Sequence, residues 1–375
     1  MTEARRPISN LARLRRLVEE SDFDAVVAVS PENVPYTAGV FIWTQRSIRE
    51  RLAIVVWPKR GEPTFIVCTI EEAEAQEGSW IEDIRTYVEF KTSPIEALAD
   101  VLEEKGLGAG TLGIEKSYLA AAYYDELRER IPKAQFRACE ALFYAARMIK
   151  TPREIELMTS AARATEKALL STLVTIQPLD SEKSMALRLS TAMFECGADQ
   201  IRFLYINAGP NSGYPHRLAG SYQTQLGDVI RTDCGAYFRG YLSDIGRTAI
   251  VGSSSEEQRS IYHRLIEIHH ETIEMVRPGV QARDVYETAK RAYESRRIPF
   301  PLPHCGHSLG MDGHEQPILN AFNTVELQAN MLLAVETRVR WPGKQGYHIE
   351  DLVQVTEGQP CVLSSFFPTQ DLFVI

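Results

Sequence analysis

The stretch VIRTDCGAYFRGYLSDIGRTAI, at residues 229–250, decides how the second half of the chain folds. Arg239-Gly240 stands between two runs of β-prone residues, and a two-residue connection of this kind predicts a β-hairpin in which the residues flanking the turn face each other. In such a hairpin Asp233 and Asp244 project from the same face as diagonal neighbours. Two buried carboxylates so close repel each other unless a shared proton or a cation compensates. The hairpin therefore predicts metal binding or acid–base chemistry, and an exposed polar face is the alternative.

A second group of acids lies in two predicted strands near the C-terminus. The run MLLAVETRV, at residues 331–339, has Glu336 inside an apolar sequence, and YHIEDLVQV, at residues 347–355, carries Glu350 and Asp351. A carboxylate buried in an apolar strand is costly unless something pairs with it. These acids therefore predict that a group which can pair with a carboxylate lies beside the sheet.

Histidines are confined to the second half of the chain, because all eight lie after residue 215. The segments HCGHSLG, at residues 304–310, and HEQP, at residues 314–317, stand between the two groups of acids. Glycines permit a close backbone approach there, and a histidine can ligate a metal or act as a general acid. This asymmetry predicts that the second half carries the chemistry.

Length and local pattern predict two domains. A chain of 375 residues suggests about two domains, and 44% hydrophobic with 24% charged residues is typical of a globular protein. The run Thr151-Pro152-Arg153-Glu154 has the form of a capping box with proline at the first helical position. We therefore expect domains at residues 1–150 and 151–375.

Hydrophobic periodicity gives the class of each domain. The expected helices lie near residues 11–18, 94–104, 118–130, 152–169, 182–196, 256–276 and 282–296, and the expected strands of the first domain near 24–29, 52–56, 64–68 and 112–115. The sequence predicts an α/β N-terminal domain and an α+β C-terminal domain with helices on a largely antiparallel sheet. Gly108-x-Gly110-x-x-Gly113 matches a dinucleotide fingerprint, but it joins a helix to a strand, so we expect only a turn.

Residues 151–360 resemble the pita-bread metallopeptidase family, which includes methionine aminopeptidase, prolidase, aminopeptidase P and creatinase. The resemblance rests on the two-aspartate hairpin, a GHxxG histidine, a following HE segment and two strand-borne glutamates. Five residues match the family's metal-ligand positions: Asp233, Asp244, His307, Glu336 and Glu350. The first 150 residues resemble the accessory domain of the prolidase and creatinase branch. The resemblance thus implies a creatinase-like N-terminal domain before a pita-bread catalytic domain.

Four carboxylates and one imidazole suit Mn²⁺, Co²⁺, Fe²⁺ or Zn²⁺. The resemblance implies two such ions per chain, bridged by Asp244 and Glu350, with a hydroxide between them that attacks the scissile carbonyl. It implies that Glu336 shuttles a proton and that His216 and His314 hydrogen-bond the substrate carbonyl or the intermediate. The bond cleaved in this branch is typically Xaa-Pro, which implies an Xaa-Pro dipeptidase or aminopeptidase.

Three residues depart from the family pattern. Thr337 stands where proline usually follows the glutamate ligand, His348 where the prolidase branch has arginine, and Ser308 where glycine is common. The change at His348 alters the charge beside the metals and leaves a small non-peptide substrate open, of the creatine, ectoine or dimethylsulfoniopropionate type. Arg217, Arg338 and His348 are candidates to bind a substrate carboxylate.

Other interpretations explain fewer of the residues. An inactive pita-bread scaffold that binds a partner, or a metal-free creatinase-type hydrolase, would not need all five ligands. A nucleophilic cysteine at Cys234 or Cys305 is less typical than a small buried thiol. His263, His269 and His270 fall on a predicted helix, and we expect them to be solvated or structural.

Composition and the resemblance also address partners and compartment. The net charge of -9 argues against a nucleic-acid partner, and no apolar run approaches the ~20 residues of a membrane span. The N-terminal sequence does not resemble an export signal, and six scattered cysteines indicate free thiols in the cytoplasm. The family often forms homodimers, and we expect Trp43, in a predicted loop at residues 36–51, to line the partner's pocket.

Overall fold

The computed structural model describes residues 7–48, 50–300 and 302–375. The chain divides into two compact units, residues 1–147 and 148–375, and each has its own β-sheet. The first six residues, part of the segment in which the sequence predicts no export signal, and Arg49 of the expected loop lie outside the described residues.

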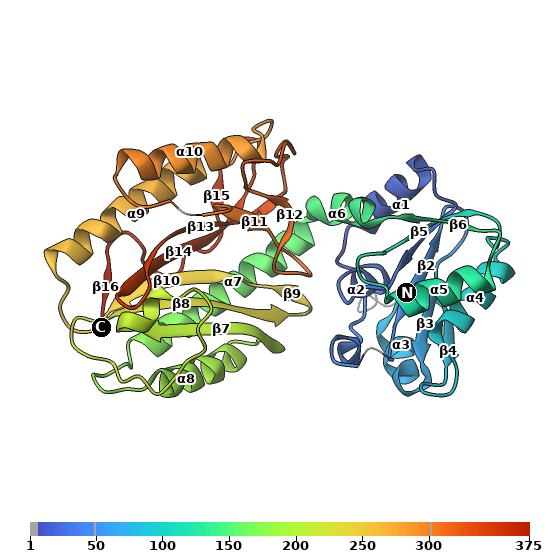
Figure 1. The fold of residues 1–375 in the computed structure, drawn as a ribbon, viewed down its shortest axis with the longest axis horizontal. Coiled ribbons are helices and arrows are strands. Elements are labelled where there is room, and N and C mark those ends of the chain that lie inside the picture. The colour runs from blue at the N-terminus through green and yellow to red at the C-terminus, as the bar shows by residue number, and fades with distance from the viewer. Residues whose placement is uncertain (1–6, 49, 301) are drawn as a thin grey trace. The chain divides into compact units, whose positions relative to one another are not determined.

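The N-terminal unit is built on a six-stranded mixed sheet with the order β4-β3-β2-β1-β5-β6 (Figure 1). Strand β2 pairs antiparallel with β1 and β3, and the other neighbours are parallel. The strands are β1 (Ala25–Ala28), β2 (Ile54–Pro58), β3 (Thr64–Cys68), β4 (Asp83–Tyr87), β5 (Thr111–Ile114) and β6 (Gln135–Ala138). The predicted α/β class is confirmed for this unit.

Helices accompany this sheet, and the core lies between strand side chains and α4 and α5. The helices are α1 (Leu11–Glu20), α2 (Asn33–Ala38), α3 (Glu72–Gly78), α4 (Pro94–Glu104), α5 (Ala121–Arg130) and α6 (Glu140–Met148), with short 3-10 turns η2 (Trp43–Arg46) and η3 (Thr69–Glu71). The prediction of a loop at residues 36–51 is partly wrong, because this segment contains the end of α2 and all of η2. A wholly buried α2 carries no amphipathic period that would reveal it.

The C-terminal unit contains a ten-stranded sheet with the main order β12-β11-β13-β14-β10-β8-β7. Along this order all neighbours are antiparallel, as predicted. The strands are β7 (Gln200–Ala208), β8 (Val229–Phe238), β9 (Tyr241–Leu242), β10 (Ile245–Ile250), β11 (Gly306–Ser308), β12 (Glu315–Ile318), β13 (Leu332–Trp341), β14 (Gln345–Gln354), β15 (Cys361–Val362) and β16 (Phe373–Val374). The α+β prediction is confirmed.

Two helix pairs pack on this sheet (Figure 1, where α7 and α8 are green and α9 and α10 orange). The pair α7 and α8 contacts β7 and β8, and α9 contacts β13 and β14. The helices are α7 (Pro152–Leu173), α8 (Glu182–Glu195), α9 (Glu256–Glu274) and α10 (Ala282–Ser295), and η4 (Gly209–Gly213) is a 3-10 turn. The predicted capping box is present, since the Thr151 side chain accepts from the Glu154 backbone N–H and the Glu154 carboxylate accepts from that of Thr151.

The hairpin has the register that its turn predicts. Phe238 pairs with Tyr241, and the same register brings Asp233 opposite Gly246. Arg239 and Gly240 both have positive φ angles, 49° and 81°, which lets the chain reverse in two residues. The turn therefore fixes which face of β8 carries Asp233.

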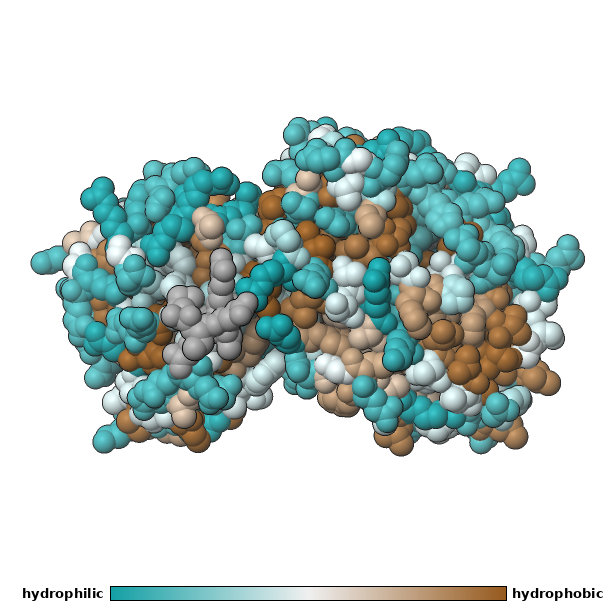
Figure 2. Space-filling model, turned by 180° about the vertical axis from the view of Figure 1, so that it is seen from behind, coloured by the Kyte–Doolittle hydropathy of each residue, from teal (hydrophilic) through white to brown (hydrophobic). Residues whose placement is uncertain are grey.

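The surface carries both polar and apolar areas. On the C-terminal unit, at the right of Figure 2, brown areas lie among teal ones. Across the described residues, no helix is both long and apolar enough to span a membrane.

Candidate metal centre

The five ligand positions predicted from the family lie on or beside five adjacent strands, β11, β13, β14, β10 and β8. His307 is on β11, Glu336 on β13, Glu350 on β14 and Asp233 on β8, and Asp244 directly precedes β10. Glu336 and Glu350 are direct cross-strand partners in the β13–β14 ladder. Because facing residues project from the same side of a sheet, strand pairing alone brings these two acids together.

Three of these residues form one compact group. Ligand atoms of Asp244, His307 and Glu350 lie within 4.8 Å of one another, and all three residues are buried. The His307 Nε2 atom is 3.9 Å from Asp244 Oδ2 and 3.8 Å from Glu350 Oε1, while its Nδ1 atom is 3.1 Å from the Ser308 carbonyl oxygen. That backbone contact holds the ring with Nε2 toward the carboxylates.

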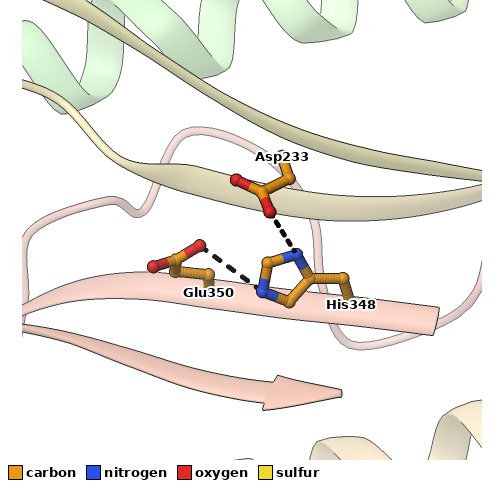
Figure 3. A group of neighbouring side chains, drawn as sticks. All are labelled: Asp233, His348 and Glu350. Atoms are coloured by element: carbon orange, nitrogen blue, oxygen red, sulfur yellow. Dashed lines mark ion pairs between the residues drawn. The ribbon is translucent and has the colours of Figure 1, made fainter. Parts of the chain in front are cut away.

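A second group contains Asp233, His348 and Glu350 (Figure 3). The His348 ring lies between the two acids, with Nδ1 3.8 Å from Asp233 Oδ2 and Nε2 3.4 Å from Glu350 Oε2. This ring packs on Gly246, where an added Cβ would lie 2.6 Å from His348 Nδ1. His348 is 1% exposed and lies among the ligand positions, and its predicted contact with the substrate stays a prediction.

Among the described residues, Glu336 belongs to neither of these two ligand groups. Basic side chains contact its carboxylate instead. Its carboxylate pairs with Arg338, lies 3.0 Å from His304 Nδ1 and is 3.4 Å from His348 Nε2. Arg338 faces His348 directly in the β13–β14 ladder. A guanidinium thus stands on the strand next to His348.

The electrostatics of the cluster show mutual repulsion among the acids. Burial, and then the charges of Glu350 and Asp233, raise the pKa of Asp244 well above its usual range. Burial and the charge of Asp233 raise the pKa of Glu350 to about 8. Burial lowers the pKa of His307 and of His348, which favours the neutral form of the ring that can ligate a metal.

A divalent cation fits this arrangement. The buried Asp244 Oδ1 atom has no hydrogen-bond partner among the described residues, and the same is true of both ring nitrogens of His348. Crowded carboxylates with unused lone pairs are stabilised by a cation, and oxygen with imidazole nitrogen suits several divalent transition metals. Asp244, His307, Glu350 and Asp233 would hold it.

The cluster opens into a cavity of about 530 Å³. His216 and His314 both line it and are exposed, and the His314 ring lies 4.0 Å from that of His307. Each imidazole is still partly covered by protein, and this loss of hydration lowers the pKa of both rings. The lining also includes Arg202, Phe203, Tyr205, Pro215, Asp233, Leu242, Asp244, Leu302, Pro303, His304, His307, Asp312, Gly313, Glu336, Arg338, Arg340 and Glu350. Trp43 lies in η2 of the N-terminal unit, stacked on Phe41 at 5.2 Å, and its predicted role stays a prediction.

Among the lining residues that were not predicted as site residues are His304 and Arg340. His304 contacts Glu336, and its proximity to His307 in sequence was the available signal. Arg340 projects from the same face of β13 as Glu336 and Arg338, because side chains two residues apart share a face. The alternation Glu336, Arg338, Arg340 could have revealed it.

Comparisons with known proteins agree with this site. Residues 156–357 match Metallopeptidase family M24, and residues 10–149 match the Creatinase/Prolidase N-terminal domain. The fold and the site define a metallopeptidase with a creatinase-type accessory domain. The chain belongs to metallopeptidase family M24.

Relatives and solved structures match nearly the whole chain. A putative dipeptidase of Bacillus subtilis (strain 168) is 26% identical over 98% of this chain and 100% of its own length. The Xaa-Pro dipeptidase of Pyrococcus furiosus is 28% identical over 92% of this chain and 95% of its own. The structure of an Xaa-Pro dipeptidase from Bacillus anthracis superposes with a TM-score of 0.86 at 26% identity and covers 98% of this chain and 99% of that one. The chain is an enzyme similar to Xaa-Pro dipeptidases, and its family implies divalent metal.

Removing Asp244 tests the ligand assignment. Wild-type protein loaded with Mn²⁺ and desalted is expected to retain about two ions per chain, whereas Asp244→Ala is expected to retain none. Asp312→Ala is the matched control, because Asp312 lines the same cavity but belongs to neither ligand group. Elemental analysis measures the ratio, and full retention in Asp244→Ala would contradict the assignment.

The raised pKa of Glu350 predicts how stability depends on pH in chelator. Glu350 binds its proton more tightly in the folded than in the unfolded chain, so its contribution to the free energy of unfolding falls as pH rises from about 4.5 to about 8. The Tm of wild-type protein should therefore fall more over this window than that of Glu350→Gln, which cannot ionise. Mn²⁺ should reverse the trend in the wild-type protein, because the metal binds the deprotonated Glu350 carboxylate and is bound more tightly as pH rises. Parallel curves in chelator would contradict the raised pKa.

Proposed function

We propose that this enzyme is a dinuclear metal-dependent hydrolase that cleaves Xaa-Pro dipeptides. The observation that carries the proposal is the convergence of three further carboxylates and His307 around Glu350, at the wall of one cavity. Two divalent ions, with Mn²⁺, Co²⁺, Fe²⁺ and Zn²⁺ as candidates, would be held by Asp233, Asp244, His307, Glu336 and Glu350.

When bound, the ions would supply a nucleophilic water at neutral pH and polarise the scissile carbonyl. The chain's own residues then orient the substrate and move the proton. Glu336, beside the cluster and 3.0 Å from His304 Nδ1, accepts a proton from the attacking water and returns it to the leaving nitrogen. His216 and His314, both on the cavity wall, donate hydrogen bonds to the substrate carbonyl oxygen.

The size of the cavity supports a small substrate. A volume of about 530 Å³ lies in the range of small-molecule sites, about 300–1,000 Å³. The relatives from Pyrococcus furiosus and Lactobacillus helveticus are both named Xaa-Pro dipeptidase. A dipeptide is therefore favoured over a long peptide, for which an aminopeptidase would need an open path.

Positive charge in the cavity supports a substrate with a free carboxylate. Arg202, Arg338 and Arg340 line it, and the buried Arg340 Nε atom has no hydrogen-bond partner among the described residues. Burial, and then repulsion by Arg338, lower the pKa of Arg340 to about 9. A substrate carboxylate would relieve this repulsion, and guanidinium and carboxylate groups match geometrically.

A second candidate function is cleavage of a small non-peptide molecule, of the creatine, ectoine or dimethylsulfoniopropionate type. The observation that favours it is the pair Arg338 and His348 in place of the usual charge pattern. Arg338 then binds the anionic end of a molecule that has no Xaa-Pro bond.

The proposal includes a homodimer in a reducing compartment, the cytoplasm. The free state of all six cysteines supports the compartment. The dimer rests on the family resemblance alone, with Trp43 of one copy at the pocket of the other.

A substrate panel tests the proposed function. Mn²⁺-loaded enzyme is expected to hydrolyse Ala-Pro and Met-Pro, to lose this activity in chelator and to act weakly on Ala-Pro-Ala. Asp244→Ala is the inactive control. Turnover of guanidino or cyclic amides without turnover of any Xaa-Pro compound would replace the proposal by the second candidate.

The carboxylate contact predicts a selective effect of Arg340. Arg340→Gln is expected to raise KM for Ala-Pro roughly 10- to 100-fold, as a lost charge-assisted hydrogen bond would, and to leave KM for Ala-Pro amide nearly unchanged. Arg283→Gln, on α10 and outside the cavity lining, is the control. Equal changes for the acid and the amide would show that Arg340 does not bind the carboxylate.

A further inference from the structure

The residues that follow Glu336 and Glu350 are joined to each other behind the metal centre. Thr337 and Asp351 are 1% and 4% exposed and lie on β13 and β14. Because side chains alternate along a strand, these two project from the sheet face opposite that of the two ligand glutamates. Glu336 faces Glu350 in the ladder, so Thr337 and Asp351 are diagonal neighbours on the helix-covered side.

One histidine from α9 spans this diagonal. His269 is 1% exposed, with Nδ1 2.9 Å from the Thr337 hydroxyl oxygen and Nε2 3.0 Å from Asp351 Oδ2. A carboxylate only accepts, so Nε2 donates to Asp351, and Nδ1 shares a hydrogen bond with the Thr337 hydroxyl, which can donate or accept. The buried imidazole is thus satisfied at both nitrogens and connects the two strands at the ligand positions.

Asp351 is in turn fixed from the other side. Arg247 Nη2 lies 2.7 Å from Asp351 Oδ1 and 2.6 Å from Glu166 Oε1 of α7, and Arg247 Nη1 donates to the Glu350 carbonyl oxygen at 2.5 Å. A buried network in which each member has partners holds its geometry tightly. Arg247 therefore holds the Glu350 backbone directly, through the carbonyl oxygen, and also through the neighbouring Asp351. The Glu336 backbone is held through its neighbour Thr337, which contacts His269.

We propose that Thr337, His269 and Asp351 form a clamp that positions Glu336 and Glu350 for the second divalent ion. These are positioning residues, since they act through the strands that carry the ligands. The inference rests on the proposed metal centre but concerns residues outside it. It also gives Thr337 a role: proline, usual at this position in the family, has no hydroxyl to offer His269.

A matched pair of substitutions tests the clamp. Thr337→Val removes the hydroxyl with little change of shape, and Thr337→Ser keeps it. With the metal-free protein titrated with Mn²⁺ by calorimetry, Thr337→Val is expected to bind the weaker of two ions about tenfold less tightly, within the 10–100-fold range of outer ligand contacts. Thr337→Ser should bind both ions like wild type. His269→Asn, whose amide reaches only Thr337, should resemble Thr337→Val.

A second readout separates positioning from general stability. Thermal unfolding in chelator reports the fold without metal, where a purely structural hydroxyl would lower Tm in Thr337→Val and leave the Mn²⁺ dissociation constants unchanged. That result would overturn the clamp. Wild-type protein that binds no Mn²⁺ would instead overturn the proposed metal centre, so the two failures are distinct. If His269→Asn does not fold, the comparison of Thr337→Val with Thr337→Ser still tests the clamp.

Discussion

Repulsion between buried carboxylates on one face of a β-sheet is the constraint on which the catalytic unit depends. Asp233, Asp244, Glu336 and Glu350 converge from adjacent strands, and burial with mutual repulsion raises the pKa of both Asp244 and Glu350. Without a compensating charge such a cluster opposes folding. A divalent cation would supply that charge, and the same field would make a bound water acidic. Fold and chemistry thus have one electrostatic origin.

The opposite face of the sheet holds the strands in place against this repulsion. There the buried Arg247 lies between Glu166 and Asp351, and His269 connects Asp351 to Thr337. The two faces differ: behind the sheet Glu166 and Asp351 both pair with Arg247, while at the front the charge of Glu350 raises the pKa of Asp244. Burial raises the pKa of Asp351, but Arg247 and His269 more than offset this and lower it below its usual range.

Local rules and the family resemblance could predict the fold class and the hairpin register from the sequence, because turn residues and strand alternation are local. The resemblance also named five ligand positions, which the structure brings onto adjacent strands but whose role as ligands stays a prediction. The sequence does not reveal which residues of different strands become neighbours in the sheet. Arg338 and His348 are ten positions apart, and only the β13–β14 register makes them neighbours. No feature of the nearby sequence distinguishes His269 from His263 and His270 on the same helix. Its contact with Asp351 depends on where α9 packs against the sheet.

The central claim is that these carboxylates hold two divalent ions. Anomalous diffraction from crystals grown with Mn²⁺ tests it most directly. The account predicts two peaks about 3.5–4 Å apart, both in contact with the Glu350 and Asp244 carboxylates, with His307 on one of them. Crystals saturated with Mn²⁺ that show no peak within ligand distance of Glu350 would contradict it.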